Sequence, residues 1–191
     1  MIARILDSEP IILIGPLKVG KTTIGKLLAK RLSCSYVSLD NLERSYTETV
    51  GFDGDIAATI QAHQGDLAWY TYRRQFFDEA VVQFLAEHNS GVLELGGGHP
   101  ILPNEEKQSR VNRALEPFGK VILLLPTSDI QESLHILKSR QKAEYLNPDL
   151  NEEFLKDNRF LELAKFTFYT EGKSPDETCD DIISRLRLPS L

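Results

Sequence analysis

The chain has 191 residues, with 22 Lys and Arg against 28 Asp and Glu and a formal net charge of −6. This length suits one domain with a full hydrophobic core, and the acidic balance without a long Lys/Arg run argues against a nucleic-acid-binding protein. Because the sequence shows neither a signal peptide nor an apolar run of roughly 18–20 residues, we expect a cytoplasmic protein without a membrane span. We also expect a monomer or a small homo-oligomer.

The first part of the chain is predicted to alternate strand, helix and strand. The aliphatic run 11–14 lies between a proline and a glycine, which is typical of a buried parallel strand. Apolar residues on one face predict a helix over 20–32. A second strand is expected over 36–39, followed directly by Asp40.

The middle of the chain continues this alternation. Residues 41–90 are expected to be mainly helical, and a third strand over 92–95 ends at three glycines. The run 121–125 is almost purely aliphatic and predicts a fourth strand. A helix follows, with apolar residues at 130, 134 and 137 on one face.

The last part begins with a polar stretch, 141–158, which we expect to be an irregular, mobile lid. Residues 166–169 predict a fifth strand. The run 174–177 (Ser-Pro-Asp-Glu) combines an N-cap serine, a proline at the first helical position and a glutamate three residues after the cap, so it predicts a helix start. This pattern predicts one three-layer α/β/α domain over residues 1–191 with a five-stranded parallel sheet.

The segment between the first strand and helix matches the phosphate-binding pattern GxxxxGK[ST] in its expected context. Backbone N–H groups of such a loop point at phosphate oxygens, Lys21 supplies charge to the β- and γ-phosphates, and the Thr22 hydroxyl is placed to ligate Mg²⁺. Lys18 is either a further phosphate ligand or a solvated loop lysine. The predicted ATP-binding residues are Gly15, Pro16, Leu17, Lys18, Val19, Gly20, Lys21, Thr22 and Thr23.

Ligands of an open parallel sheet bind beyond the carboxyl ends of its strands, so Asp40 and the glycines 96–98 are expected beside this loop. Asp40 either orients and deprotonates an attacking hydroxyl or caps the next helix. The glycines either admit a substrate to bare backbone or form a tight turn. We interpret His99 as a surface or turn-stabilising histidine. Arg73 and Arg74 are candidates for binding a carboxylate.

Taken together, these motifs resemble the shikimate kinase family, whose small members are P-loop kinases. The opening run IILIGPLKVGKTTIGKLLAKRL, the Asp40 segment, the triple glycine and the run ELAKFTF (162–168) occur in the family's order and span nearly the whole chain. The resemblance implies that the γ-phosphoryl group of ATP is transferred, with Mg²⁺, to a hydroxyl of a small carboxylated polyol, and shikimate is the expected acceptor.

The resemblance also implies roles for individual residues. The catalytic set is Lys21, Asp40 and, as a cation near the lid, Arg140. The substrate-binding set is Asp40, Arg74, Gly96, Gly97, Gly98, Lys156 and Arg159. The family's first carboxylate-binding arginine matches Arg74 if the alignment is shifted by one residue, and Arg73 is the alternative. The second matches Lys156 without a gap, or Arg159 with a small shift.

Several positions depart from the family's pattern. Ser38 stands in place of the first aspartate of an Asp-x-Asp pair, Leu95 in place of a small hydroxyl residue, and Glu144 in place of a lid arginine. Glu94, one place before Leu95, is expected to compensate for it only if the strand shifts register, and otherwise to be salt-bridged or capped. Three hypotheses follow: a shikimate kinase, a kinase for another small hydroxylated or nucleotide acceptor, or an ATP-binding regulator with little catalysis.

Overall fold

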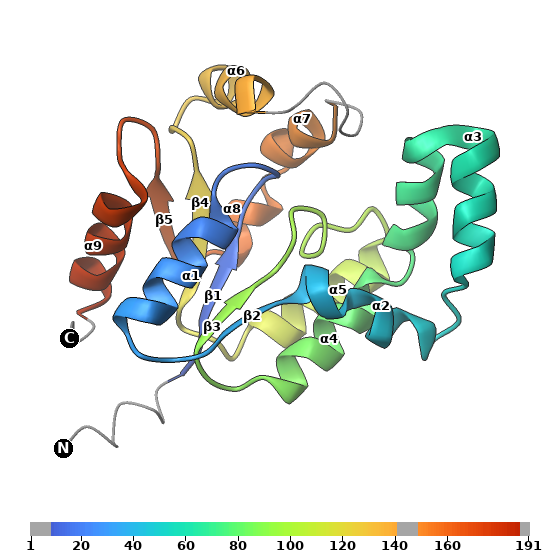
Figure 1. The fold of residues 1–191 in the computed structure, drawn as a ribbon, viewed down its shortest axis with the longest axis horizontal. Coiled ribbons are helices and arrows are strands. Elements are labelled where there is room, and N and C mark those ends of the chain that lie inside the picture. Colours follow the sequence, from blue (N-terminus) through green and yellow to red (C-terminus); the bar gives the residue numbers. More distant parts are fainter. Residues whose placement is uncertain (1–8, 141–148, 188–191) are drawn as a thin grey trace.

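The computed structural model describes residues 9–140 and 149–187. Within these residues, five strands and nine helices alternate for most of the chain (Figure 1). In chain order they are β1 (Ile11–Ile14), α1 (Lys21–Arg31), β2 (Tyr36–Ser38), α2 (Leu39–Glu48), α3 (Gly54–Arg74), α4 (Phe77–Glu87), β3 (Val92–Glu94), α5 (Glu105–Leu115), β4 (Val121–Leu125), α6 (Ile130–Arg140), α7 (Asp149–Lys156), α8 (Arg159–Leu163), β5 (Phe166–Tyr169) and α9 (Pro175–Leu186).

The five strands form one parallel sheet in the order β2-β3-β1-β4-β5. From β1 the chain crosses to β2 at one edge of the sheet, whereas from β3 it crosses back over β1 to reach β4. The connection that leaves β1 runs over one face of the sheet through α1, and the one that leaves β3 runs over the other face through α5, so a crevice forms where these two strands end. The five strands predicted from the sequence and their parallel arrangement are confirmed.

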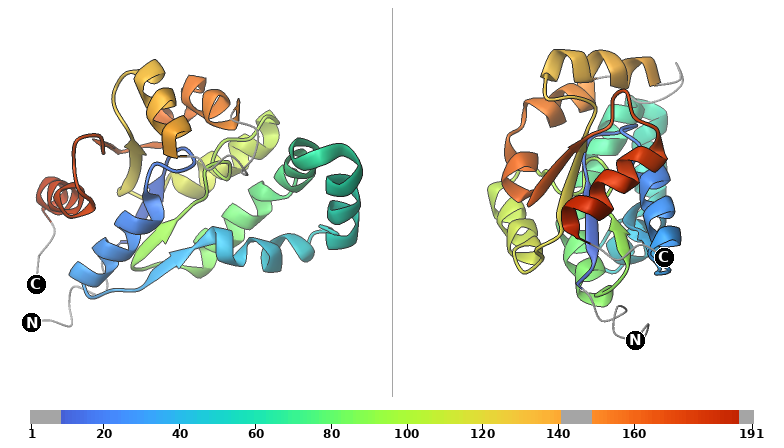
Figure 2. Two further views of the ribbon diagram at one scale, coloured as in Figure 1. Left: turned by 45° about the horizontal axis from the view of Figure 1, so that its top comes forward. Right: turned by 90° about the vertical axis from the view of Figure 1, so that its left-hand side faces the viewer.

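The sheet separates two hydrophobic cores. Along β1, Ile11 and Leu13 pack with α1 and α9, whereas Ile12 and Ile14 pack with the core of α2, α4 and α5. This alternation is the two-residue period of a strand, and it makes every β1 residue buried. Figure 2 shows α1 and α9 together on one side of the sheet, with α4, α5 and α8 on the other. The three-layer prediction is confirmed.

Helix α7 corrects the prediction for the lid. Residues 149–156, expected to be irregular, are helical because Leu150 and Phe154, one turn apart, are both buried against the core. Residues 141–148 of the predicted lid, which include Glu144, lie outside the described residues. The other difference in this region is Ile130, which is exposed rather than on the buried face of α6.

The helix termini show which local sequence patterns were sufficient to predict where a helix begins. Ser174 and Glu177 form both hydrogen bonds of the predicted capping box at the start of α9. Helix α5 was not predicted, although Asn104 caps it by accepting from Lys107 N–H and two glutamates begin its first turn. In the described part of the chain, no helix combines the length and the apolar character needed to cross a membrane.

Candidate active site

The phosphate-binding loop joins the end of β1 to α1 and depends on two glycines. Gly15 has a φ of 142°, and a Cβ atom there would lie 2.4 Å from the carbonyl oxygen of Leu124 on the neighbouring strand. Gly20 is the N-cap of α1 with a φ of 106°. Both conformations favour glycine, so the loop can turn sharply from the end of β1 into the N-terminus of α1, and a helix N-terminus attracts anions.

Lys21 begins α1 and is buried, although its side chain carries a charge. Its Nζ donates to the carbonyl oxygens of Gly15 and Pro16, each at 2.9 Å. Burial lowers the pKa of Lys21, and the negative charges of Glu94 and Asp40 act in the opposite direction. The ammonium group is thus held inside the loop by neutral acceptors, where a negatively charged phosphate can compete for it.

Thr22 connects the loop to β3. Its Oγ1 donates to Oε1 of Glu94 at 2.9 Å, and the Tyr36 hydroxyl donates to the other carboxylate oxygen. Glu94 is only 2 % exposed and lies opposite Leu13 in the regular β1–β3 pairing. The expectation that Glu94 needs a register shift to reach this site is therefore wrong, because β3 is the direct neighbour of β1 and ends beside the loop.

Asp40 lies beside the triple glycine, as predicted. It is the second residue of α2, whose N-cap is Ser38, so the alternative role of Asp40 as the helix cap is not observed. A Cβ atom at Gly96 would come 2.1 Å from Asp40 Oδ1, and one at Gly98 would come 1.9 Å from the Tyr70 hydroxyl. Any side chain at these two positions would displace groups that border the crevice.

A buried chain of hydrogen bonds runs from this turn to α3. Gly96 N–H donates to Nδ1 of His99 at 2.9 Å, so the proton of the neutral imidazole is on Nε2, which lies 3.0 Å from Glu43 Oε2. Arg73 Nη2 then binds both oxygens of Glu43, at 2.7 and 2.8 Å. His99 is 2 % exposed, so the prediction of a surface histidine is wrong and that of a turn-stabilising one fits the geometry.

The same series of hydrogen bonds affects the pKa of Glu43. Burial acts to raise the pKa of this carboxyl, but the hydrogen bond from His99 and the guanidinium of Arg73 outweigh it and hold the pKa below its ordinary value. Oxygen and nitrogen atoms of Asp40, Glu43 and His99 lie within 4.8 Å of one another. Since Arg73 and the Gly96 N–H occupy this cluster, we interpret it as a hydrogen-bond network rather than a cation site.

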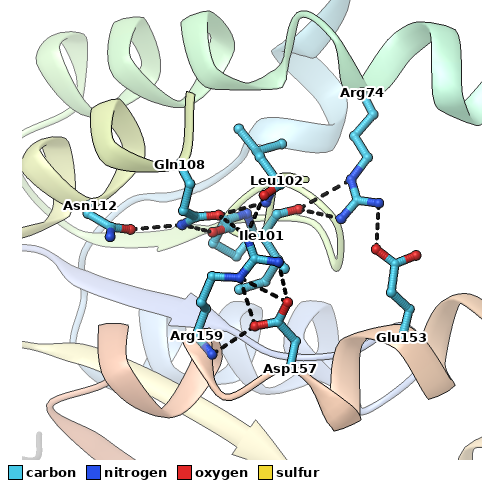
Figure 3. Close-up of polar contacts among 9 residues, drawn as sticks. Arg74, Ile101, Leu102, Gln108, Asn112, Glu153, Asp157 and Arg159 are labelled. Carbon is cyan, nitrogen blue, oxygen red and sulfur yellow. Dashed lines mark hydrogen bonds and ion pairs between the residues drawn. The ribbon is translucent and has the colours of Figure 1, made fainter. Parts of the chain in front are cut away.

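Further cations of the predicted acceptor set are bound to acids within the chain. Arg74 is buried, donates to Glu153 at 2.6 Å and binds the Ile101 carbonyl oxygen at 2.7 Å, as Figure 3 shows. Arg159, in the same view, pairs with Asp157 and donates to the Leu102 carbonyl. The ion pairs of these candidates, Arg73 included, are Arg73–Glu43, Arg74–Glu153, Arg140–Glu171, Lys156–Glu152 and Arg159–Asp157.

The structure therefore brings together one part of the predicted site and leaves another part apart from it. Lys21, Thr22, Asp40 and the glycines meet at the ends of β1, β2 and β3, whereas Arg140 contacts Glu171 after β5. Sequence reasoning missed Glu43, whose position three residues after Asp40 on a helix places it one turn away on the same side. It also missed Tyr36, which no local pattern connects to Glu94.

Comparisons with known proteins agree with this arrangement. A family model described as shikimate kinase matches residues 18–187. The shikimate kinase of Streptomyces coelicolor is 32 % identical over 188 residues, covering 96 % of this chain and 98 % of that protein. That of Streptomyces avermitilis is 30 % identical over 181 residues, covering 93 % and 95 %. A solved structure of shikimate kinase from Acinetobacter baumannii in complex with shikimate has a TM-score of 0.62 at 18 % identity, over 98 % of this chain and 97 % of that one, and this likeness shows the fold.

A parallel sheet in this order, with a P-loop at the end of its central strand and an acidic residue and bare backbone beside it, defines a P-loop phosphotransferase. With the family model and relatives at 30–32 % identity over nearly the whole chain, the protein belongs to the shikimate kinase family. The resemblance found in the sequence motifs is thereby confirmed.

Proposed function

We propose that this protein transfers the γ-phosphoryl group of ATP to a hydroxyl of shikimate and so forms shikimate 3-phosphate. The observation that carries the proposal is the meeting of Lys21, Asp40 and the triple glycine in one crevice, where the charges of Lys21 and Asp40 interact. Phosphoryl transfer requires positioning and charge neutralisation rather than covalent participation of the protein, and these residues provide both.

The nucleotide is bound by the loop of residues 15–23. Phosphate oxygens are bound by the α1 N-terminus and by loop N–H groups other than that of Leu17, which donates to Asn151, and Lys21 exchanges its carbonyl partners for the β- and γ-phosphates. Because both partners that it gives up are uncharged, the exchange favours the phosphate. Lys21 then neutralises charge on the group that is transferred.

The acceptor hydroxyl is oriented by Asp40. Its side chain is 58 % exposed at the crevice, and the bare backbone of Gly96 leaves its carboxylate accessible. A carboxylate in hydrogen-bonding reach of the hydroxyl aligns it toward the phosphoryl group and accepts its proton as the new P–O bond forms. The Gly96 N–H bond to His99 holds the glycine turn in place beside Asp40.

Mg²⁺ is the metal that this family uses with ATP, and the oxygen donors near the loop fit it. Thr22 is an exposed residue whose hydroxyl is hydrogen-bonded to a carboxylate, and these oxygen donors are of the kind suited to a hard cation. When bound, the ion supplies positive charge to the β- and γ-phosphate oxygens.

One observation favours a second candidate, a kinase of the same class for a different acceptor. An acceptor carboxylate normally binds an arginine fork, yet Arg73, Arg74 and Arg159 are each already paired with an internal acid. A carboxylated acceptor that binds one of these arginines therefore competes with an internal acid. An uncharged polyol would bind without such competition.

ADP formation by the purified protein with Mg²⁺ and ATP, with and without shikimate, tests the proposal. We expect slow ATP hydrolysis alone and a large shikimate-dependent increase. The same assay with an uncharged cyclic polyol, gluconate and a nucleoside monophosphate tests the second candidate. Faster turnover of one of these compounds would show that it, rather than shikimate, is the acceptor. ATP binding with no acceptor-dependent turnover would contradict both kinase functions. A cytoplasmic location and a monomer or small homo-oligomer stay predictions.

A further inference from the structure

Glu94 is a buried acid at the phosphate-binding end of the site. Its two carboxylate oxygens accept hydrogen bonds from Thr22 and Tyr36, both of them uncharged side chains, and no ion pair to it forms among the residues that the structure describes. The positive charge that it faces is that of Lys21, whose pKa it acts to raise. A buried carboxylate with only neutral partners is unfavourable, so a cation bound beside it would be strongly stabilised.

The sheet register relates Glu94 to the serine that departs from the family's pattern. Ser38 on β2 pairs directly with Glu94 on β3, and both strands are parallel. Tyr36 and Val92 belong to the core on the α1 side of the sheet, and two-residue alternation places Ser38 and Glu94 on that same side. Neighbouring strands lie about 4.8 Å apart, so the two side chains occupy adjacent positions on the face that Thr22 covers.

We propose that Glu94 supplies the carboxylate of the Mg²⁺ site, and that this carboxylate has moved by one strand, from position 38 to position 94. A threonine hydroxyl has one O–H and two lone pairs, so Thr22 can donate to Glu94 and still offer a lone pair to the ion. Glu94 then balances the charge of the ion and orients its threonine ligand. This inference rests on the proposed ATP-dependent function.

Tyr36 holds the carboxylate in the required orientation. Its ring packs on α1 at Gly25, where a Cβ atom would come 2.8 Å from Tyr36 Cε2. Its hydroxyl donates to one oxygen of Glu94. With one oxygen bound to Tyr36 and the other to Thr22, the carboxylate has little freedom to rotate away from the loop.

Mn²⁺, which is detected by electron paramagnetic resonance, provides a test that needs neither acceptor nor turnover. The measured quantity is the affinity of Mn²⁺ for the complex of the full-length protein with a non-hydrolysable ATP analogue. We expect Glu94→Gln to weaken this affinity about 10- to 100-fold. Affinity for the nucleotide in excess chelator should not fall. The exchange variant Ser38→Asp with Glu94→Ser, which returns the carboxylate to β2, should regain most of the Mn²⁺ affinity.

Asp78→Asn is the matched control, since Asp78 is also 2 % exposed. It lies on α4 and pairs with Arg110 on α5, and both helices cover the face of the sheet opposite α1. This variant should bind Mn²⁺ as the unchanged protein does. Wild-type Mn²⁺ affinity in Glu94→Gln, or an exchange variant that binds as weakly as Glu94→Gln, would overturn the proposal. If Glu94→Gln does not fold, the exchange variant alone decides between these outcomes. Failure of shikimate turnover appears only in the ADP assay and leaves this measurement interpretable.

Discussion

The two ends of the crevice differ in what their cations are bonded to. At the phosphate end Lys21 is held by two carbonyl oxygens, whereas at the acceptor end Arg73, Arg74 and Arg159 are held by carboxylates. Both sets of bonds have a charged donor, for which a hydrogen bond contributes about 1.5–3 kcal/mol, but only the arginine bonds also join opposite charges. The phosphate end can therefore exchange partners readily for any phosphate, while the acceptor end exchanges them only for a ligand that replaces a lost ion pair.

Lys21→Ala should have the largest effect, because it removes the buried ammonium group that the phosphate-binding loop encloses. We expect kcat/KM for ATP to fall by at least about 10³-fold, comparable to the loss of a main electrostatic stabiliser. Steady-state kinetics and calorimetric ATP binding measure it. Since Lys21 is buried, Lys21→Met, which keeps the apolar stem, separates lost charge from lost packing.

Lys30→Ala is the control for this experiment, as it removes an exposed lysine from the same helix. It should change neither ATP affinity nor rate. ATP affinity in Lys21→Met equal to that of the unchanged protein would contradict the assignment of the loop.

Asp40→Asn tests the residue that is proposed to orient the acceptor hydroxyl and accept its proton. We expect kcat to fall by about 10²- to 10⁴-fold, the range of general base catalysis, with ATP affinity unchanged. Asp55→Asn removes an exposed acid from the first turn of α3 and should leave both quantities as they are. A fall in ATP affinity as large as the fall in kcat would show that Asp40 acts on the nucleotide instead.

Glu43→Gln should give a smaller change with the opposite sign. Glutamine keeps the shape and can accept from His99, but it frees Arg73 from its ion pair. We expect KM for shikimate to fall several-fold, equivalent to about 1 kcal/mol, with KM for ATP unchanged. An unchanged or higher KM for shikimate would show that Arg73 is not limited by its internal partner.

Acid stability provides an independent measure of the same pair. Because the folded protein holds the pKa of Glu43 below its ordinary value of 4.5, this carboxylate stabilises the fold above that pH, and the contribution is lost as pH falls through the lowered value. The difference in unfolding free energy between the unchanged protein and Glu43→Gln should therefore shrink below pH 4.5. Glu79→Gln, which breaks the pair with Arg110, should show a similar acid dependence without any change in KM.

The sequence predicted those parts of the molecule that local patterns determine. The P-loop, the five strands and the capping box at Ser174 each depend on residues within a few positions of one another. The partners of Glu94 and His99 depend instead on which strands are neighbours and on how α2 and α3 pack, and a single sequence does not contain the sheet order. Helix α7 was missed because its three apolar residues, Leu150, Phe154 and Leu155, occur in a short stretch that is too brief for a clear helical period.

Asn151 gives the molecule a mechanical connection between two segments that are 134 residues apart in sequence. Its side-chain amide accepts from the Leu17 N–H at 2.8 Å and donates to the Leu17 carbonyl at 3.2 Å, and it is 1 % exposed. Helix α7 cannot move away from the nucleotide loop without breaking both bonds or carrying residue 17 with it. A single amide thus makes the shape of the loop and the position of α7 one shared degree of freedom, and a nucleotide that rigidifies the loop also immobilises the helix.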